Sequence, residues 1–174
     1  AYSNKGQFDE AISNYDRAIQ LNPKNAAAYY NRGIAYAQLT DSGRAIADFT
    51  NAIKINKRLA LAYAYRSLML SKNSHFDRAI SDYRRAISLD PQLESKLETV
   101  RFEYWHNLAV KKPDQAVVEL SKVIRSKPNA AIAARAYNYR CMAYRIKGKT
   151  ELAKRDSKKA FELASYLNFI CDAR

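Results

Sequence analysis

The stretch FDEAISNYDRAIQLNP at residues 8–23 returns as FDRAISDYRRAISLDP at residues 76–91, so two near-copies lie 68 residues apart. Small residues mark the period between and beyond them, at intervals of 34 and then 37 residues: Ala11, Ala45, Ala79, Ala116 and Ala153. In most copies a second small residue recurs with the same period as the first. A repeated unit of this length predicts a stack of similar supersecondary units.

Each unit contains two segments whose apolar residues recur at helical spacing. Between Asp9 and Leu21, for example, apolar positions three and four residues apart alternate with charged and amide residues. Proline follows the second segment at Pro23, Pro91 and Pro128, where a helix has to stop. The whole chain has only four glycines and four prolines, which favours long helices with short connections. We therefore expect stacked helical hairpins.

The composition argues against a membrane-spanning protein and leaves several classes of binding partner open. No apolar run of about 18 residues occurs, so we expect no membrane span. The 174 residues carry a net charge of +13, with twelve basic residues against Glu151 and Asp156 between Lys122 and Lys159. Such an excess can favour acidic partners, nucleic acid or anionic surfaces.

The repeated positions resemble the tetratricopeptide repeat. Its 34-residue pattern appears in the second copy at these positions: Tyr29, Arg32, Gly33, Tyr36, Ala45, Phe49 and Ala52. In the third copy it appears at Tyr63, Arg66, Ser67, Leu70, Ala79, Tyr83, Ala86 and Pro91. The resemblance implies an all-α fold, a right-handed superhelical solenoid of antiparallel helix pairs.

The register divides the chain into a half-repeat at 1–25, full repeats at 26–59 and 60–93, longer units at 94–130 and 131–167, and a C-terminal cap at 168–174 that continues the last helix. In the unit at 94–130, the residues beyond the 34-residue pattern are expected in a longer turn around Ala109 to Pro113. In the unit at 131–167, they are expected at a helix start around Ala131 to Ala133. Tyr2 matches the last turn of a first helix, so we expect a fragment of a longer chain. A targeting signal would lie upstream, and no compartment is assigned.

In this family the concave side, lined by first helices, usually holds peptides or helices of partner proteins. Carried over by register, the groove residues are Tyr30, Ile34, Leu61, Leu68, Phe102, Trp105, His106, Arg135, Asn138, Met142 and Arg145. Phe102 and Trp105 are candidate anchors, since aromatic residues often dominate interface energetics; packing in the core is the alternative. Arg135 and Arg145 are expected to favour acidic residues at one end of the partner.

Another well-known use of the fold resembles a clamp of Lys, Asn and Arg side chains for C-terminal carboxylates of chaperones. Asn31 matches one clamp position, but Leu61 and Tyr65 stand where Lys and Arg are needed. We therefore expect a partner segment held by apolar contacts.

Catalysis is not expected, because His75 and His106 lie in no nucleophile or metal motif and no phosphate-binding glycine loop occurs. The sequence predicts no cofactor and no metal.

Two alternatives to a single protein partner remain open. The basic charge would suit a helical repeat module on RNA or DNA, although much of it falls on second helices. The apolar groove, or the aromatic tail at 161–174, could instead mediate self-association.

Overall fold

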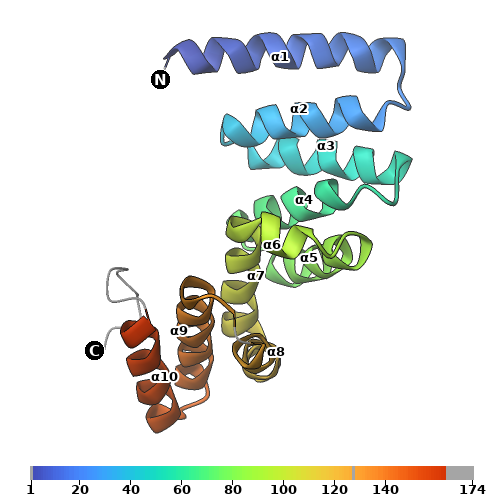
Figure 1. Cartoon of the computed structure of the whole chain (residues 1–174). Helices are drawn as coiled ribbons and strands as arrows, with labels where there is room; N and C mark the ends of the chain where they lie inside the picture. Colours follow the sequence, from blue (N-terminus) through green and yellow to red (C-terminus); the bar gives the residue numbers. More distant parts are fainter. Residues whose placement is uncertain (1, 127, 164–174) are drawn as a thin grey trace. The chain divides into compact units, whose positions relative to one another are not determined.

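The apolar-periodic segments fold into helices, without a strand in the part of the chain that the structure describes, residues 2–126 and 128–163. The computed structural model gives their order (Figure 1). The helices are α1 (Tyr2–Leu21), α2 (Ala26–Gln38), α3 (Ser42–Ile55), α4 (Ala60–Lys72), α5 (Phe76–Leu89), α6 (Leu93–Lys96), α7 (Glu98–Lys111), α8 (Pro113–Arg125), α9 (Ala130–Ile146) and α10 (Thr150–Leu163). The expected all-helical array is confirmed.

The turns inside three helix pairs share one geometry. Thr40 and Ser74 have a φ of 61° and Gly148 a φ of 67°, so all three lie in the left-handed region. After each of them, a backbone N–H donates to a carbonyl five residues earlier: Asp41 to Tyr36 at 2.9 Å, His75 to Leu70 at 2.8 Å and Lys149 to Tyr144 at 2.8 Å. This bond satisfies an otherwise unpaired helix carbonyl, so each turn ends the first helix and reverses the chain.

Helix starts are fixed by side-chain caps in three places. Asn25 accepts the backbone N–H of Ala28 at 3.0 Å, Asp41 that of Arg44 at 2.9 Å, and Asn129 that of Ile132 at 2.9 Å. A cap of this kind satisfies one of the unpaired donors of the first helical turn.

The core consists of the repeated small positions and the large residues between them. Alanines at the repeated small positions of α3, α5, α8 and α10 are almost completely buried, with 0 to 2% exposure: Ala45, Ala52, Ala79, Ala86, Ala116, Ala153 and Ala160. Phe49 and Leu120 are 0% exposed and Tyr83 is 5% exposed. Cys141 is also fully buried. Small side chains let the helices approach while the large ones fill the space between layers.

The fourth repeat departs from the expectation for its extra residues. The turn around Ala109 to Pro113 is not lengthened, because α7 continues to Lys111 and α8 begins at Pro113. Only Lys112 lies between these helices. The additional chain lies earlier, where the short helix α6 separates α5 from α7. In the fifth unit α9 has 17 residues where α2 and α4 have 13, which agrees with an extended first helix.

The first helix also differs from the expectation. Tyr2 does not end a preceding helix, because α1 runs without a break from Tyr2 to Leu21. Gly6 does not interrupt it; a helix tolerates a single glycine, and no neighbouring atom lies within 4 Å of a Cβ built there. The expected cap at 168–174 lies outside the described residues.

Contacts divide the chain into two units, residues 1–101 (unit 1) and residues 102–174 (unit 2). None of the helices in the described part of the chain is long and apolar enough to cross a bilayer.

Candidate partner-binding surfaces

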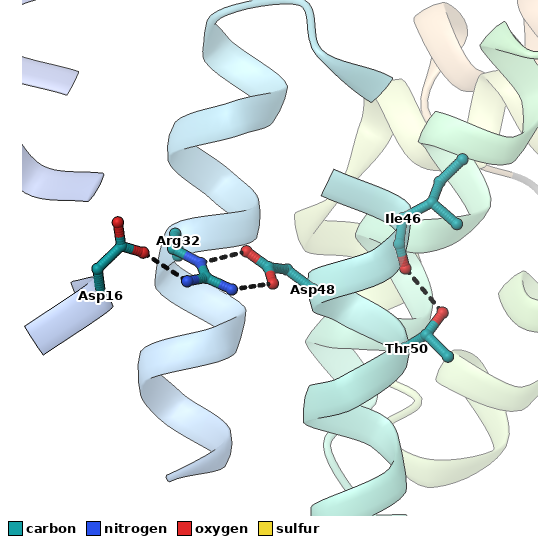
Figure 2. Close-up of polar contacts among 5 residues, drawn as sticks. All are labelled: Asp16, Arg32, Ile46, Asp48 and Thr50. Carbon is teal, nitrogen blue, oxygen red and sulfur yellow. Dashed lines mark hydrogen bonds and ion pairs between the residues drawn. The ribbon is translucent and has the colours of Figure 1, made fainter. Parts of the chain in front are cut away.

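A partly buried arginine joins three successive helices in unit 1. Arg32 of α2 donates to both carboxylate oxygens of Asp48 in α3, at 2.7 and 2.8 Å (Figure 2). Its remaining terminal nitrogen contacts Asp16 of α1 at 2.5 Å. The hydrogen bond to Asp48 raises the pKa of Arg32 further above its usual value. The guanidinium therefore stays charged and fixes α2 between its two neighbours.

The same pairing of one arginine with both carboxylate oxygens of an aspartate, which we call a fork, recurs with the repeat. Arg66 of α4 donates to Asp82 at 2.6 and 2.8 Å, and Arg140 of α9 donates to Asp156 at 2.6 and 2.8 Å. Each also reaches a hydroxyl of the preceding second helix, Thr50 at 3.1 Å or Ser121 at 2.8 Å. In the fourth repeat the corresponding carboxylate, Glu119, accepts the Tyr104 hydroxyl at 2.6 Å.

A tyrosine three residues before each forked arginine packs against it. The guanidinium carbon lies 5.6 Å from the ring centre of Tyr29, 5.6 Å from that of Tyr63 and 5.3 Å from that of Tyr137. These are the aromatic positions that open each repeat in the sequence. Each takes part in a cation–π contact that stabilises its fork. We call the forks together with these tyrosine contacts the frame.

The frame leaves an apolar surface on the first helices of unit 1. Its residues are all partly exposed, and we call them the apolar first-helix surface: Tyr30 and Ile34 of α2, with Leu61, Tyr65 and Leu68 of α4. Tyr30, Ile34, Tyr65 and Leu68 pack on a buried cluster that contains Tyr36, Phe49 and Met69. Four residues of the predicted groove, Tyr30, Ile34, Leu61 and Leu68, belong to this partly exposed surface of α2 and α4.

Aromatic rings make up much of this surface. The Tyr30 ring centre lies 6.0 Å from Phe49 and 6.1 Å from Tyr65, the latter in an edge-to-face arrangement. Burial, and secondarily the Tyr65 hydroxyl, raise the pKa of Tyr30 to about 12. At neutral pH the Tyr30 phenol therefore offers a neutral hydrogen-bonding group beside apolar area.

The apolar first-helix surface carries little charge. The only ionisable cation in α2 is Arg32, and α4 contains only Arg66 and, at its last residue, Lys72. Both arginines are forked to aspartates and are mostly buried, with side-chain exposures of 19% and 14%. In a chain with a net charge of +13, these helices therefore present an uncharged face.

Unit 2 brings together a second group of predicted residues. Phe102 of α7 lies 5.6 Å from Trp105 between ring centres, and the Arg135 guanidinium of α9 lies 4.3 Å from the Phe102 ring. Tyr139 of α9 lies 6.3 Å from both Trp105 and His106. This aromatic and cationic cluster joins α7 and α9.

Trp105 differs from the expectation of an exposed anchor. Its exposure is only 3%, because it packs between Phe102 and Tyr139, so its surface is not open to a partner. The core role named as the alternative describes Trp105 correctly. Phe102 and His106 remain partly exposed, as do Arg135, Asn138 and Met142, whereas Arg145 is exposed at the last turn of α9.

Tyr65 and Tyr139 also belong to these surfaces, although neither was among the predicted groove residues. Each directly precedes a forked arginine, Arg140 or Arg66, which is the sequence signal that could have found them. Burial raises the pKa of Tyr139, and the positive charge of Arg135 partly opposes that rise. Arg135 is thus engaged with both Tyr139 and Phe102.

The described residues contain no group of three or more His, Cys, Asp and Glu side chains that could hold a metal ion. His75 is exposed at the start of α5, and His106 packs against Tyr139.

Comparisons with known proteins agree with this architecture. A family model described as "TPR repeat" matches residues 1–39, and one described as "Tetratricopeptide repeat" matches residues 26–59 and 58–93, so together they cover more than half of the chain. No curated protein matched the sequence.

Solved structures share the fold over most of the chain. MamA is 25% identical over 92% of this chain and 91% of its own, with a TM-score of 0.76. YrrB, described as a TPR protein with an unusual peptide-binding site, is 22% identical over 94% of this chain and 81% of its own, with a TM-score of 0.80. The first TPR of Spaghetti (RPAP3), bound to the HSP90 peptide SRMEEVD, is 27% identical over 57% of this chain and 82% of its own, with a TM-score of 0.51.

Proposed function

The chain belongs to the tetratricopeptide-repeat family, whose domains typically mediate protein–protein interactions, and we propose that it binds a segment of a partner protein on its first helices. The observation that carries the proposal is the apolar first-helix surface of unit 1. Five partly exposed apolar or aromatic side chains from two helices lie there, and the charged residues of those helices are Arg32 and Arg66, which are paired with aspartates, and Lys72 at the end of α4.

The chemistry of this surface favours an uncharged, apolar segment. The Spaghetti (RPAP3) domain is bound to an acidic HSP90 peptide, SRMEEVD. In this chain the corresponding clamp positions hold Leu61 and Tyr65, which cannot pair with a carboxylate as Lys and Arg do. Binding would instead come from burial of aliphatic and aromatic area.

Unit 2 supplies a different kind of contact. Phe102 offers a partly exposed ring, and Arg135, a partly exposed cation, lies over it. Trp105 supports this ring from the interior. We therefore assign preference for acidic residues to Arg135 in unit 2 and preference for apolar residues to unit 1.

The arginine forks make the receptor side rigid. Arg32, Arg66 and Arg140 each link helices through hydrogen bonds that do not involve the exposed first-helix residues. A surface held in place before binding loses less conformational entropy when a partner docks. The repeats therefore work as a preformed scaffold.

The test compares two matched double variants of unit 1. Ile34→Glu with Leu61→Glu introduces two carboxylates into the apolar first-helix surface. Leu21→Glu with Ile55→Glu makes the same chemical change at second-helix ends, where the residues are 81% and 38% exposed. Circular dichroism checks that both variants fold, and affinity capture from the native source with nuclease present is read by mass spectrometry.

The proposal expects a defined protein that the wild type and the control variant capture and the Ile34→Glu/Leu61→Glu variant loses. Equal capture by both variants would show that the partner uses another surface. Material that disappears with nuclease would favour the basic nucleic-acid module instead. Recovery of a second copy of this chain, lost in the surface variant, would identify self-association through these helices.

A further inference from the structure

Two turns of unit 2 lie against each other at one end of the unit. Lys147 in the turn between α9 and α10 forms an ion pair with Asp114 in the first turn of α8. The turn between α7 and α8 directly precedes Asp114. The ion pair thus brings residues 110–114 and 145–149 into one surface, which we call the basic tip.

Positive charge dominates the basic tip. Five of its ten residues are cations, Lys111, Lys112, Arg145, Lys147 and Lys149, against one carboxylate, Asp114, so its net charge is +4. All of them except Lys112 are exposed. The next acidic residue, Glu151, forms an ion pair with Lys154 of its own helix at 3.0 Å.

Two aliphatic side chains stand among these cations. Val110 is 37% exposed and Ile146 is 52% exposed, one from each turn. Neither segment contains an aromatic residue. Single-stranded nucleic acid is usually held by aromatic stacking in addition to phosphate contacts, and the tip offers no ring for stacking. Aliphatic residues surrounded by Lys and Arg are instead the composition that suits the interface of an anionic bilayer.

We propose that the basic tip docks unit 2 on an anionic lipid surface. The lysine and arginine side chains contact headgroup phosphates and carboxylates, while Val110 and Ile146 enter the boundary between headgroups and acyl chains. Both turns of the basic tip lie at helix ends, so they can contact a flat bilayer at the same time, and no cleft is required. The apolar first-helix surface is made of other residues of other helices, so this contact is additional to partner binding.

The experiment measures sedimentation of the full chain with vesicles of phosphatidylcholine alone or mixed with phosphatidylserine. Lys147→Glu with Lys149→Glu brings the tip from +4 to zero net charge. Lys122→Glu with Lys158→Glu makes the same change on the exposed faces of α8 and α10. These control positions lie eight or more residues inside their helices, roughly 12 Å along the axis from the tip.

We expect binding to the mixed vesicles only, with a loss of at least about thirtyfold in the tip variant and less than about a twofold loss in the control. Ile146→Ser, which leaves the charge unchanged, should also weaken vesicle binding. Circular dichroism confirms that each variant is folded.

Three results would overturn the proposal. Wild-type protein that does not sediment with the mixed vesicles has no such surface. Equal losses in the tip and control variants would show that net charge alone, and not the tip, determines binding. Binding to single-stranded RNA without binding to vesicles would assign the tip to nucleic acid.

Discussion

Unit 1 and unit 2 share one internal frame but differ in what their first helices expose. Arg32 and Arg66 in unit 1 and Arg140 in unit 2 make the same two bonds to an aspartate sixteen residues later. Outside that frame, unit 1 presents uncharged aliphatic and tyrosine side chains, whereas unit 2 presents Phe102 beneath Arg135. A frame held by buried polar bonds leaves the exposed positions able to differ between repeats.

The two units also fill their interiors differently. A Cβ added at Gly33 would lie 2.8 Å from Phe49, so the large ring and the glycine depend on each other. In the last repeat the register places Cys141 where Gly33 stands and Ser157 where Phe49 stands. A larger residue on one helix thus accompanies a smaller one on the other, as close packing requires.

The largest expected effect comes from breaking a fork. Arg140→Met leaves the Asp156 carboxylate, whose side chain is 1% exposed, without its cation. An unpaired buried charge costs about 3–5 kcal/mol, so chemical denaturation should show a large loss of stability. Arg32→Met in unit 1 should cost a similar amount, since Asp48 is also buried, with 4% side-chain exposure.

A double variant provides the control for that prediction. Arg140→Met with Asp156→Leu removes both charges and should recover part of the stability lost by Arg140→Met alone. A double variant as unstable as the sum of its single changes would show that the fork's charges are not coupled. A mild Arg32→Met beside a severe Arg140→Met would show that the two units do not share one frame.

Glycine substitutions give a smaller effect that separates packing from helix propensity. Gly33→Ala should destabilise unit 1 by about 1–3 kcal/mol, because its methyl group overlaps the Phe49 ring. Gly6→Ala in α1, where an added Cβ meets nothing within 4 Å beyond its chain neighbours and the backbone of its own helix, should stabilise by about 0.5–1 kcal/mol. Thermal unfolding measures both, and a neutral Gly33→Ala would contradict the close contact.

Alkaline pH should affect unit 1 through Tyr30. The pKa of Tyr30 in the folded protein, about 12, lies above the usual 10. Its contribution to the free energy of unfolding is therefore complete below pH 10 and is lost as the pH rises toward 12. Tyr30→Phe should therefore lose less stability than the wild type over that range, and the tyrosinate absorbance should show one fewer late-titrating phenol. Identical pH profiles would contradict the burial of this hydroxyl. Tyr139→Phe should have the smaller effect, because Arg135 opposes the rise.

The smallest effect is expected at the exposed ion pair between Lys147 and Asp114. The Asp114 side chain is 80% exposed, so water screens the pair. Asp114→Asn should leave the unfolding midpoint unchanged within error, in contrast to the buried fork of the same unit. A clear loss of stability would show that the turn contact helps to hold unit 2 together.

The helices, their pairing and most first-helix positions could be predicted because they follow from apolar periodicity and repeat register. The forks could not, since a residue type alone does not show that Arg32 and Asp48 meet across two helices. Their spacing of sixteen residues, repeated at Arg66 and Arg140, is nevertheless visible in the sequence. The burial of Trp105 depends on its contacts with α7 and α9 side chains, which register does not specify.

The most direct test of partner binding on unit 1 is photo-crosslinking from within the apolar first-helix surface. The benzoyl derivative of phenylalanine is placed at Leu68, and in a matched protein at Ile55, the exposed last residue of α3. We expect one defined partner to be crosslinked from Leu68 and not from Ile55. A partner crosslinked from Ile55 alone, or equally from both positions, would contradict it.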